Sequence, residues 1–393
     1  MSVAIAAIAV VEPQMEALFH APFNAALLHA VLLAYPEAAV SFRAFPEHAR
    51  GVREILDEQA PGLAARVEWR VVPFAAGGSV VRRWRQCERA IREVLGHSPS
   101  RLPNRRERVL FCSVSRMQLL ALKRAMRRSD QVRAVLHGDL DQLERPPRER
   151  FPMRLFALER VLQRPHPAGL RYLLLGDSIR DRLPERLRPA FADPGVIDHP
   201  YHFFPVRAAG ARGPRLPAAP VFGIFGNSGS GRQLEAVARA VKAVDPTIRF
   251  RLVGFVADQA AVERLRPFVE EVGDQPLARA AFLKRAEEIT HALWLAPPNS
   301  FRLRASGTFF DALAYAKPLI YTANPYIDGY FDRAPGIGTR CATAAAVPQA
   351  ILEAAAGHSE AAYGVQRAAI ERLRERFSPA ALAERLPAAL AWD

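Results

Sequence analysis

Cysteine is scarce in this chain, and its spacing limits the class of protein. Cys87, Cys112 and Cys341 stand far apart among 393 residues. This excludes a scaffold held by disulfides and a zinc ribbon built on CxxC pairs, and it fits a reducing compartment. Long hydrophobic runs are absent too. No stretch approaches about 18 uninterrupted apolar residues, so no membrane-spanning helix is expected.

No secretory signal is expected from the first residues. The opening MSVAIAAIAVVEP has no basic region, and its apolar run is short and β-branched. It is typical of a buried first strand rather than a signal peptide, so we expect a cytoplasmic protein, at most peripheral to the inner membrane face. Half of the chain is hydrophobic and 24% is charged, which excludes wholesale disorder.

Lysine is almost missing: only four lysines occur among 54 basic residues. Arginine abundance of this kind accompanies GC-rich coding, so it is not by itself a sign of function. Its placement is more informative. Residues 82–133 hold 15 Lys and Arg against four acids, in a chain of net charge +14. A basic face of this kind suits anionic lipid, nucleic acid or phosphorylated substrates.

Short apolar, β-branched runs alternate with helical patterns along the whole chain. Strands separated by helices of about 10–15 residues predict parallel sheets covered on both faces, an α/β fold. The expected strands are residues 3–11, 40–45, 67–74, 109–114, 132–136, 172–175, 221–225, 250–255, 292–296 and 319–322.

A stretch rich in Pro, Gly and Ala interrupts this alternation at residues 205–219 and predicts a linker. We therefore expect two Rossmann-like domains, at residues 1–204 and 220–376, facing each other across a cleft. The last segment, 377–393, is expected to form a terminal helix.

The second domain opens with a strand that runs into a glycine-rich loop, FGNSGSGR, and then a helix. Glycines permit close approach of a ligand, and the helix start offers N–H groups to a phosphate. The spacing differs from the dinucleotide fingerprint, and Arg-Gln replaces the Lys and Ser/Thr of a P-loop, so ATP hydrolysis is not expected. We expect a metal-independent diphosphate site; the alternative is a plain strand-to-helix turn. The candidate residues are Gly226, Asn227, Ser228, Gly229, Gly231 and Arg232.

A second candidate anion site follows the strand expected at 292–296. Two arginines precede a Ser-Gly-Thr turn that starts a helix, where backbone donors and the helix dipole favour an anion. An aspartate one turn in is placed to accept from ribose hydroxyls. The alternative is that the serine only caps the helix and the arginines are solvated. The candidate residues are Arg302, Arg304, Ser306, Gly307, Thr308 and Asp311.

The stretch SGTFFDALAYAKPLIYT resembles the nucleotide-sugar motif of GT-B glycosyltransferases, a small-residue turn followed by an acid, A-[LM]-A and [GA]-K-P-[LV]-I. FGNSGSGR resembles the first loop of their donor domain, and RFSPAALAERLPAAL resembles their terminal helix, which crosses back to the first domain. The resemblance implies that the second domain holds a nucleotide-sugar donor and the first domain an acceptor.

One departure from this family pattern concerns stereochemistry. Many retaining members carry Glu-x7-Glu, and the second Glu matches Asp311 while the first falls at Leu303. The flanking Arg302 and Arg304 indicate a diphosphate-binding variant. The retaining or inverting outcome is therefore open.

Sugar transfer needs a base for the acceptor hydroxyl, and polar residues at strand ends of the first domain are the candidates. His137 follows a buried strand, and His20 and Glu16 follow the first strand, as do Glu12 and Asn24. A structural role for His137 is equally open. The run 139–141 (Asp-Leu-Asp) has the D-x-D form of metal-dependent GT-A transferases, but the phosphate-type loops stand in the second half, so no metal site or other cofactor is expected.

A basic helix is expected at residues 80–95, with Val81, Trp84, Ile91 and Leu95 on its inner side. The resemblance implies an anionic membrane surface as its partner, and the alternative is a solvated face; nucleic acid is not expected without a recognised motif. The exposed arginines are Arg82, Arg85, Arg89 and Arg92.

The sequence thus predicts a GT-B-like hexosyltransferase acting in cell-surface polysaccharide or glycolipid synthesis on a glycan or lipid-linked acceptor. Two alternatives stand beside it: a sugar-nucleotide epimerase of the same build, and a non-catalytic nucleotide-binding protein. No motif names the sugar, the base of the nucleotide or the acceptor.

Overall fold

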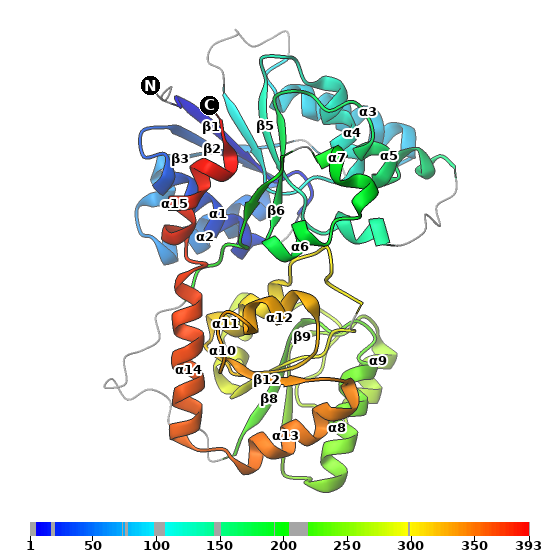
Figure 1. Cartoon of the computed structure of the whole chain (residues 1–393), viewed down its shortest axis with the longest axis vertical. Helices are drawn as coiled ribbons and strands as arrows, with labels where there is room; N and C mark the ends of the chain where they lie inside the picture. The colour runs from blue at the N-terminus through cyan, green and yellow to red at the C-terminus, as the bar shows by residue number, and fades with distance from the viewer. Residues whose placement is uncertain are drawn as a thin grey trace. The chain divides into compact units, whose positions relative to one another are not determined.

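The computed structural model describes residues 5–16, 20–72, 74, 78–97, 107–144, 151–191, 193–203, 219–297 and 299–392. The chain divides by its contacts into two compact units (Figure 1). Unit 1 comprises Met1–His202, Arg302–Ala305 and Phe377–Asp393, and unit 2 comprises Phe203–Phe301 and Ser306–Arg376. The predicted linker, 205–219, lies outside the described residues except for its last position.

Unit 1 contains a seven-stranded parallel sheet in the order β3-β2-β1-β4-β5-β6-β7. The strand order reverses direction between β1 and β4, and ligands of such sheets bind at the carboxyl ends of the strands near the reversal. The strands are β1 (Ala7–Val11), β2 (Ala39–Ala44), β3 (Val67–Val71), β4 (Arg108–Phe111), β5 (Gln131–Val135), β6 (Leu170–Leu175) and β7 (Gly195–Ile197).

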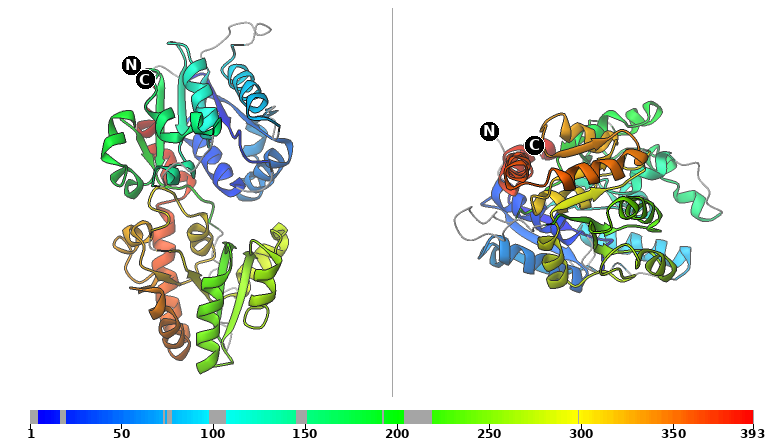
Figure 2. Two further views of the ribbon diagram at one scale, coloured as in Figure 1. Left: turned by 90° about the vertical axis from the view of Figure 1, so that its right-hand side faces the viewer. Right: turned by 90° about the horizontal axis from the view of Figure 1, so that it is seen from below.

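Helices cover both faces of this sheet (Figure 2). They are α1 (Ala21–Ala34), α2 (Pro46–Gln59), α3 (Val80–Val94), α4 (Arg116–Ala125), α5 (Leu158–Leu162), α6 (Asp177–Asp181), α7 (Arg188–Phe191) and the terminal α15 (Pro379–Leu390). Helix α15 packs against α1 and β7. Arg133 of β5 donates to the carbonyls of Leu390 and Ala391, and Arg108 donates to that of Trp392 at 3.0 Å. The end of the chain is thereby part of unit 1.

Unit 2 contains a five-stranded parallel sheet in the order β12-β11-β10-β8-β9, so its reversal lies between β8 and β10. The strands are β8 (Val221–Asn227), β9 (Arg249–Phe255), β10 (His291–Trp294), β11 (Leu319–Thr322) and β12 (Gly338–Cys341). The helices are α8 (Arg232–Val244), α9 (Gln259–Leu265), α10 (Arg279–Glu288), α11 (Gly307–Ala314), α12 (Pro325–Phe331), α13 (Val347–Ala356) and α14 (Glu360–Glu375).

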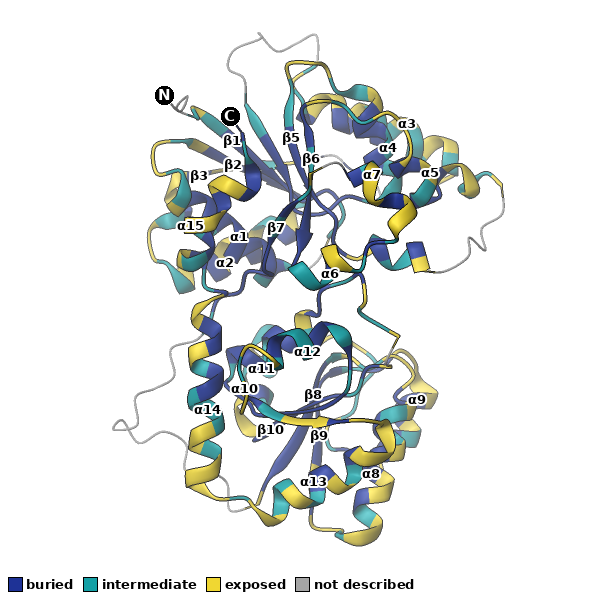
Figure 3. Ribbon diagram, in the orientation of Figure 1, coloured by how far each residue is buried: buried dark blue, intermediate teal, exposed yellow. Residues whose placement is uncertain are grey.

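The burial pattern explains why the sequence alternation found most elements. Most strand residues are buried, β3 and β12 at the sheet edges being the exceptions, and the outward faces of the helices are exposed (Figure 3). The prediction missed β7 and β12, which are short edge strands without an apolar run. Helix α9 ends at Leu265, two residues before Pro267, which cannot continue the hydrogen bonding of a helix.

The predicted inner face of α3 was wrong at its first turn. Val81 is 57% exposed, and the buried side is formed by Cys87, Ala90, Ile91 and Val94. Every helix in the described part of the chain is too short or too polar to cross a membrane.

Candidate active site

The glycine-rich loop forms a rigid turn after β8. Gly226 and Gly231 have φ angles of 74° and 66°, in the left-handed region that glycine adopts most easily. The side chain of Asn227 accepts from the N–H of Gly229 at 2.8 Å, and the N–H of Gly231 donates to the carbonyl of Ser228 at 3.0 Å. These donors are engaged within the turn, so the start of α8 at the exposed Arg232 remains as the anion-facing part of this loop.

The glycine-rich loop and the Ser-Gly-Thr turn meet in unit 2. A Cβ atom added to Gly226 would lie only 2.6 Å from Cγ2 of Thr308. The two segments follow β8 and β10, the neighbouring strands at the reversal of the sheet. Two motifs that the sequence shows separately therefore form one surface at the position where such sheets bind ligands.

The start of α11 is built around Ser306, which is buried. Its Oγ accepts from the N–H of Phe309 at 3.4 Å and from Nε1 of Trp294 at 3.0 Å, and it lies 3.1 Å from Oγ1 of Thr308. The first two helical N–H groups, of Gly307 and Thr308, have no intrahelical acceptor by geometry, and the helix dipole favours an anion there. Asp311 follows one turn later and is half-buried.

The two arginines of this motif belong by their contacts to unit 1, within the segment Arg302–Ala305. Nε of Arg302 lies 3.0 Å from Oε1 of Glu144, and Nε of Arg304 lies 3.2 Å from Oδ2 of Asp141. Leu303, at the position where retaining family members carry the first Glu, is fully buried. This position packs in the core and supplies no catalytic carboxylate. Contact of the arginines with a diphosphate stays a prediction.

The acids of the D-x-D run are engaged with protein groups. Asp139 accepts from the side chain of Gln142 at 2.8 Å, and burial raises the pKa of Asp139. Asp141 pairs with Arg304. Within the described residues, no three His, Cys, Asp or Glu side chains gather to hold a metal ion.

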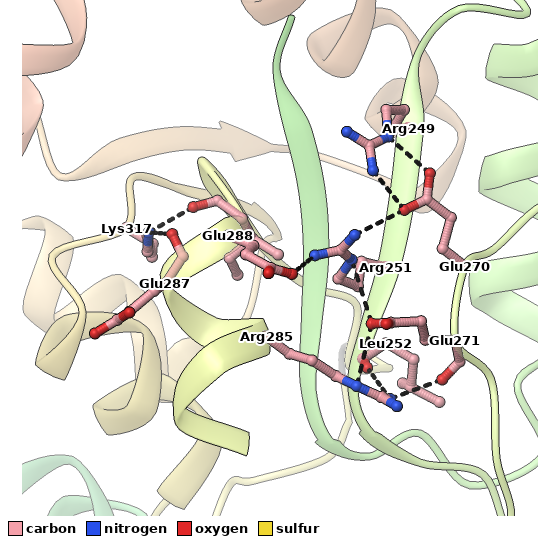
Figure 4. Close-up of polar contacts among 10 residues, drawn as sticks. Arg249, Arg251, Leu252, Glu270, Glu271, Arg285, Glu287, Glu288 and Lys317 are labelled. Carbon is pink, nitrogen blue, oxygen red and sulfur yellow. Dashed lines mark hydrogen bonds and ion pairs between the residues drawn. The ribbon is translucent and has the colours of Figure 1, made fainter. Parts of the chain in front are cut away.

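Lys317, part of the stretch that resembles the nucleotide-sugar motif, is a structural residue. Its buried Nζ donates to the carbonyls of Glu287, at 3.0 Å, and of Ile289, so it closes the end of α10 (Figure 4). Burial lowers its pKa to about 7. A neutral amine still has two N–H groups to donate, which matches the two carbonyls.

In unit 1, His20 and His137 come together. His137 follows β5 and His20 directly precedes α1, and their rings stack with centroids 4.2 Å apart and planes 26° apart. Phe23 and His199 approach the His137 ring at 5.1 and 5.8 Å. Within the described residues, Nε2 of His137 and Nδ1 of His20 are buried without a hydrogen-bond partner. Glu16, the third predicted candidate, is exposed.

These imidazoles are uncharged at neutral pH. Burial lowers the pKa of His20, and the Glu12 carboxylate opposes this fall. Burial lowers the pKa of His137 well below its usual range, and the charges of His20, His199 and Arg304 lower it further. Burial also lowers the pKa of His199 to about 3. A neutral imidazole is able to accept a proton.

A buried polar network lies at the ends of β1 and β4, and Glu12, with no exposed surface, is its centre. Its carboxylate accepts from Oγ of Ser113 at 2.6 Å and from Nδ2 of Asn24 at 3.1 Å. The same Nδ2 lies 2.8 Å from Nε2 of His48. Sequence reasoning missed Ser113 and His48. Ser113, a polar residue after an apolar strand, offered a signal, whereas His48 lies in a charged helix and offered none.

The fold matches solved structures of glycosyltransferases. HepE from Anabaena, in complex with UDP and glucose, matches with a TM-score of 0.62 and 13% identity over 98% of this chain and 99% of its own. A glycosyltransferase from Rickettsia africae matches with 0.60 and 12% over 98% of both chains. A variant of TarM from S. aureus, in complex with fondaparinux, alpha-GlcNAc-glycerol and UDP, matches with 0.53 and 11% over 78% of this chain.

The chain spans 59% of the length of that TarM structure. No protein-family model and no curated protein sequence matches the chain. The prediction of a GT-B fold with two Rossmann-like domains is confirmed by these structures and by the two parallel sheets.

Proposed function

We propose that the chain is a glycosyltransferase that moves a sugar from a nucleoside diphosphate to an acceptor hydroxyl. One observation carries this proposal: the contact of Gly226 with Thr308, which joins a glycine-rich turn to an open helix start at the sheet reversal of a GT-B fold. HepE and TarM were both solved with UDP, so UDP is the first nucleotide to test.

In the donor site, the N–H groups at the start of α11 and the start of α8 with Arg232 would hold the diphosphate, and Asp311 would accept from the ribose. Charge builds up on the diphosphate as the sugar departs, and fixed dipoles and guanidinium groups stabilise it without reorganising. Arg302 and Arg304 would add positive charge. This donor set neutralises the leaving group without a metal, so we propose metal-independent transfer.

The acceptor hydroxyl would lose its proton to an imidazole of unit 1. As the acceptor oxygen bonds to the anomeric carbon, the base takes the proton and the diphosphate leaves with the electrons of the broken bond. We assign the base to His20, because it is half-buried whereas His137 is only 8% exposed. The buried Glu12 carboxylate would stabilise the imidazolium that forms.

An anionic membrane surface is the proposed location of the acceptor. Helix α3 presents arginines to solvent, and it lies beside the turn 153–156, where Trp84 packs on Phe156 at 5.4 Å. Large apolar side chains are exposed in the same region: Val81 57%, Phe151 79% and Leu155 52%. Cationic and apolar groups together suit an anionic bilayer and a lipid-linked glycan acceptor.

Calorimetric titration tests the donor site. We expect UDP to bind without metal and added magnesium to leave the affinity unchanged. A preference for ATP with magnesium, or no nucleotide binding, would contradict the proposal. In an activity assay with a UDP-sugar, release of UDP only when a glycan acceptor is added would support sugar transfer. Conversion of the UDP-sugar in the absence of an acceptor would indicate an epimerase.

Vesicle co-sedimentation tests the membrane surface. We expect binding to vesicles rich in phosphatidylglycerol that weakens as salt rises, and little binding to phosphatidylcholine. Replacing Arg85 and Arg89 of α3 by Gln is expected to weaken it, with Arg372 and Arg376 near the end of α14 replaced as a matched control. Equal vesicle binding by both double variants would show that α3 is not part of the membrane-binding surface.

A further inference from the structure

The ring of His137 packs against three other rings. It stacks on His20, and Phe23 of α1 meets it at an interplanar angle of 89° with centroids 5.1 Å apart. His199, two residues after β7, meets it at 74° and 5.8 Å. Rings from two segments, the start of α1 and the residues after β7, thus pack against one buried imidazole, and of these rings that of His20 is half-buried.

We propose that His137 is a positioning residue for His20: its ring fixes the plane of the His20 ring and stays uncharged while His20 carries the proton. The role given to His20 rests on the proposed function. The contact between the rings rests on the geometry alone.

The backbone at His20 has an uncommon conformation. His20 has a φ of 63°, in the left-handed region, immediately before α1. Non-glycine residues are held in this region only when their surroundings fix them, and functional sites are frequent places for it. The carbonyl of His20 accepts the N–H of Asn24 at 2.9 Å, which secures the backbone, while the ring of His20 contacts Phe23 edge-on at 6.5 Å and stacks on His137 at 4.2 Å.

Burial and the surrounding charges together decide which ring takes a proton, and burial is the largest cause that lowers the pKa of both rings. Two imidazolium groups at 4.2 Å repel each other strongly in a buried setting, so the pair accepts one proton. Glu12 favours the charged form of His20, and His48 opposes it. His199 and Arg304 both oppose a charge on His137. The proton is therefore directed to His20.

Two substitutions separate a positioning role from a basic one. His137→Phe keeps a flat ring and removes the titrating group, whereas His137→Ala removes the ring. We expect His137→Phe to retain turnover within about threefold, and His137→Ala to lose kcat by about 10- to 100-fold with little change in the donor KM. His20→Phe is expected to lose about 10²- to 10⁴-fold as the base. Loss in His137→Phe as large as in His20→Phe would overturn the proposal, because His137 would then be the base.

A second readout does not depend on turnover. The NMR titration of the His20 ring, assigned by its loss in His20→Phe, is expected to keep its midpoint in His137→Phe. In His137→Ala the midpoint is expected to move towards about 6.5, since water reaches the ring. His166→Phe, which alters a histidine packed on Tyr172, serves as the matched control and is expected to change nothing.

An unchanged titration midpoint of His20 in His137→Ala would contradict the proposal that the His137 ring packs on the His20 ring. Full activity of His20→Phe would show that His20 is not the base. The NMR titration of His20 in His137→Ala would still show whether the two rings are in contact. The two failures are therefore distinguishable.

Discussion

At the scale of single residues, Gly226 lies close to Thr308 in the proposed donor site. Gly226→Ala adds a methyl group 2.6 Å from Cγ2 of Thr308 at a φ of 74°. Thr308 must then move, and the first N–H groups of α11 move with it. We expect UDP affinity to fall by about tenfold or more, measured by calorimetry.

Two variants serve as controls for this prediction. Gly229→Ala places a side chain on a residue with a similar positive φ, 57°, so its backbone strain is similar. Its Cβ would meet nothing within 4 Å, so we expect a smaller loss of affinity for UDP. Thr308→Ser removes the clashing methyl group and is expected to restore much of the affinity when combined with Gly226→Ala. Equal losses in Gly226→Ala and Gly229→Ala would show that the contact with Thr308 has no part in binding.

Ser113 is a second residue whose side chain is expected to contribute measurably to the stability of the fold. It donates to the fully buried Glu12 carboxylate at 2.6 Å. Ser113→Ala leaves one lone pair of a buried charge without its donor, so we expect a loss of about 1.5–3 kcal/mol in the free energy of unfolding, measured with urea. Ser300→Ala, which removes an exposed hydroxyl bonded to the carbonyl of Pro297, is expected to cost less than about 1 kcal/mol.

At the scale of elements, β9 is an edge strand held by a network of charges (Figure 4). Arg251 contacts the carboxylates of Glu270, Glu271 and Glu288, and its side chain is 10% exposed. Arg251→Met leaves these acids facing one another. Since they are partly exposed, we expect a loss of about 1–3 kcal/mol in stability, measured by denaturant unfolding.

Arg249 supplies the matched control on the same strand. It pairs with Glu270 at 2.7 Å, but its side chain is 47% exposed. Arg249→Met is therefore expected to cost less than about 1 kcal/mol. If both variants unfold at the same urea concentration, the burial of Arg251 does not account for its contribution to the stability of this edge strand.

At the scale of the whole molecule, buried neutral histidines make stability depend on pH. Burial lowers the pKa of His199 and His202 to about 3 and that of His291 to about 4. In the unfolded chain these groups titrate near about 6.5, so between pH 4 and that value the unfolded state binds more protons than the folded state. Stability is therefore full above this window and falls as pH decreases through it.

We expect the thermal midpoint to change little from pH 8 to 7 and to fall steadily from pH 6.5 to 4.5, measured by calorimetry. His202→Gln removes one titrating group and is expected to make the fall shallower. A midpoint that stays constant down to pH 4.5 would show that these histidines are not buried in solution.

The sequence predicted the fold well because both sheets are buried, and buried parallel strands are continuous apolar runs. The strand 319–322 was predicted with its observed bounds, whereas β12, with two exposed residues, carried no such run. The candidate site was predicted less completely. Loop residues such as His20 and His137 could be placed at strand ends, but their stacking depends on two distant segments meeting, which no local pattern encodes. The contact of Gly226 with Thr308 depends likewise on the order of β8 and β10 in the sheet.

The return of α15 to unit 1 has a consequence for synthesis on the ribosome. The acceptors of Arg133 lie at Leu390 and Ala391, and α15 covers α1, which is made from residues 21–34. Every residue of unit 2 is translated before residue 377, so unit 2 is complete while unit 1 still lacks its last helix. The two units therefore become complete in the reverse of the order in which their synthesis begins: a chain that stops before residue 377 contains all of unit 2 and lacks helix α15 of unit 1.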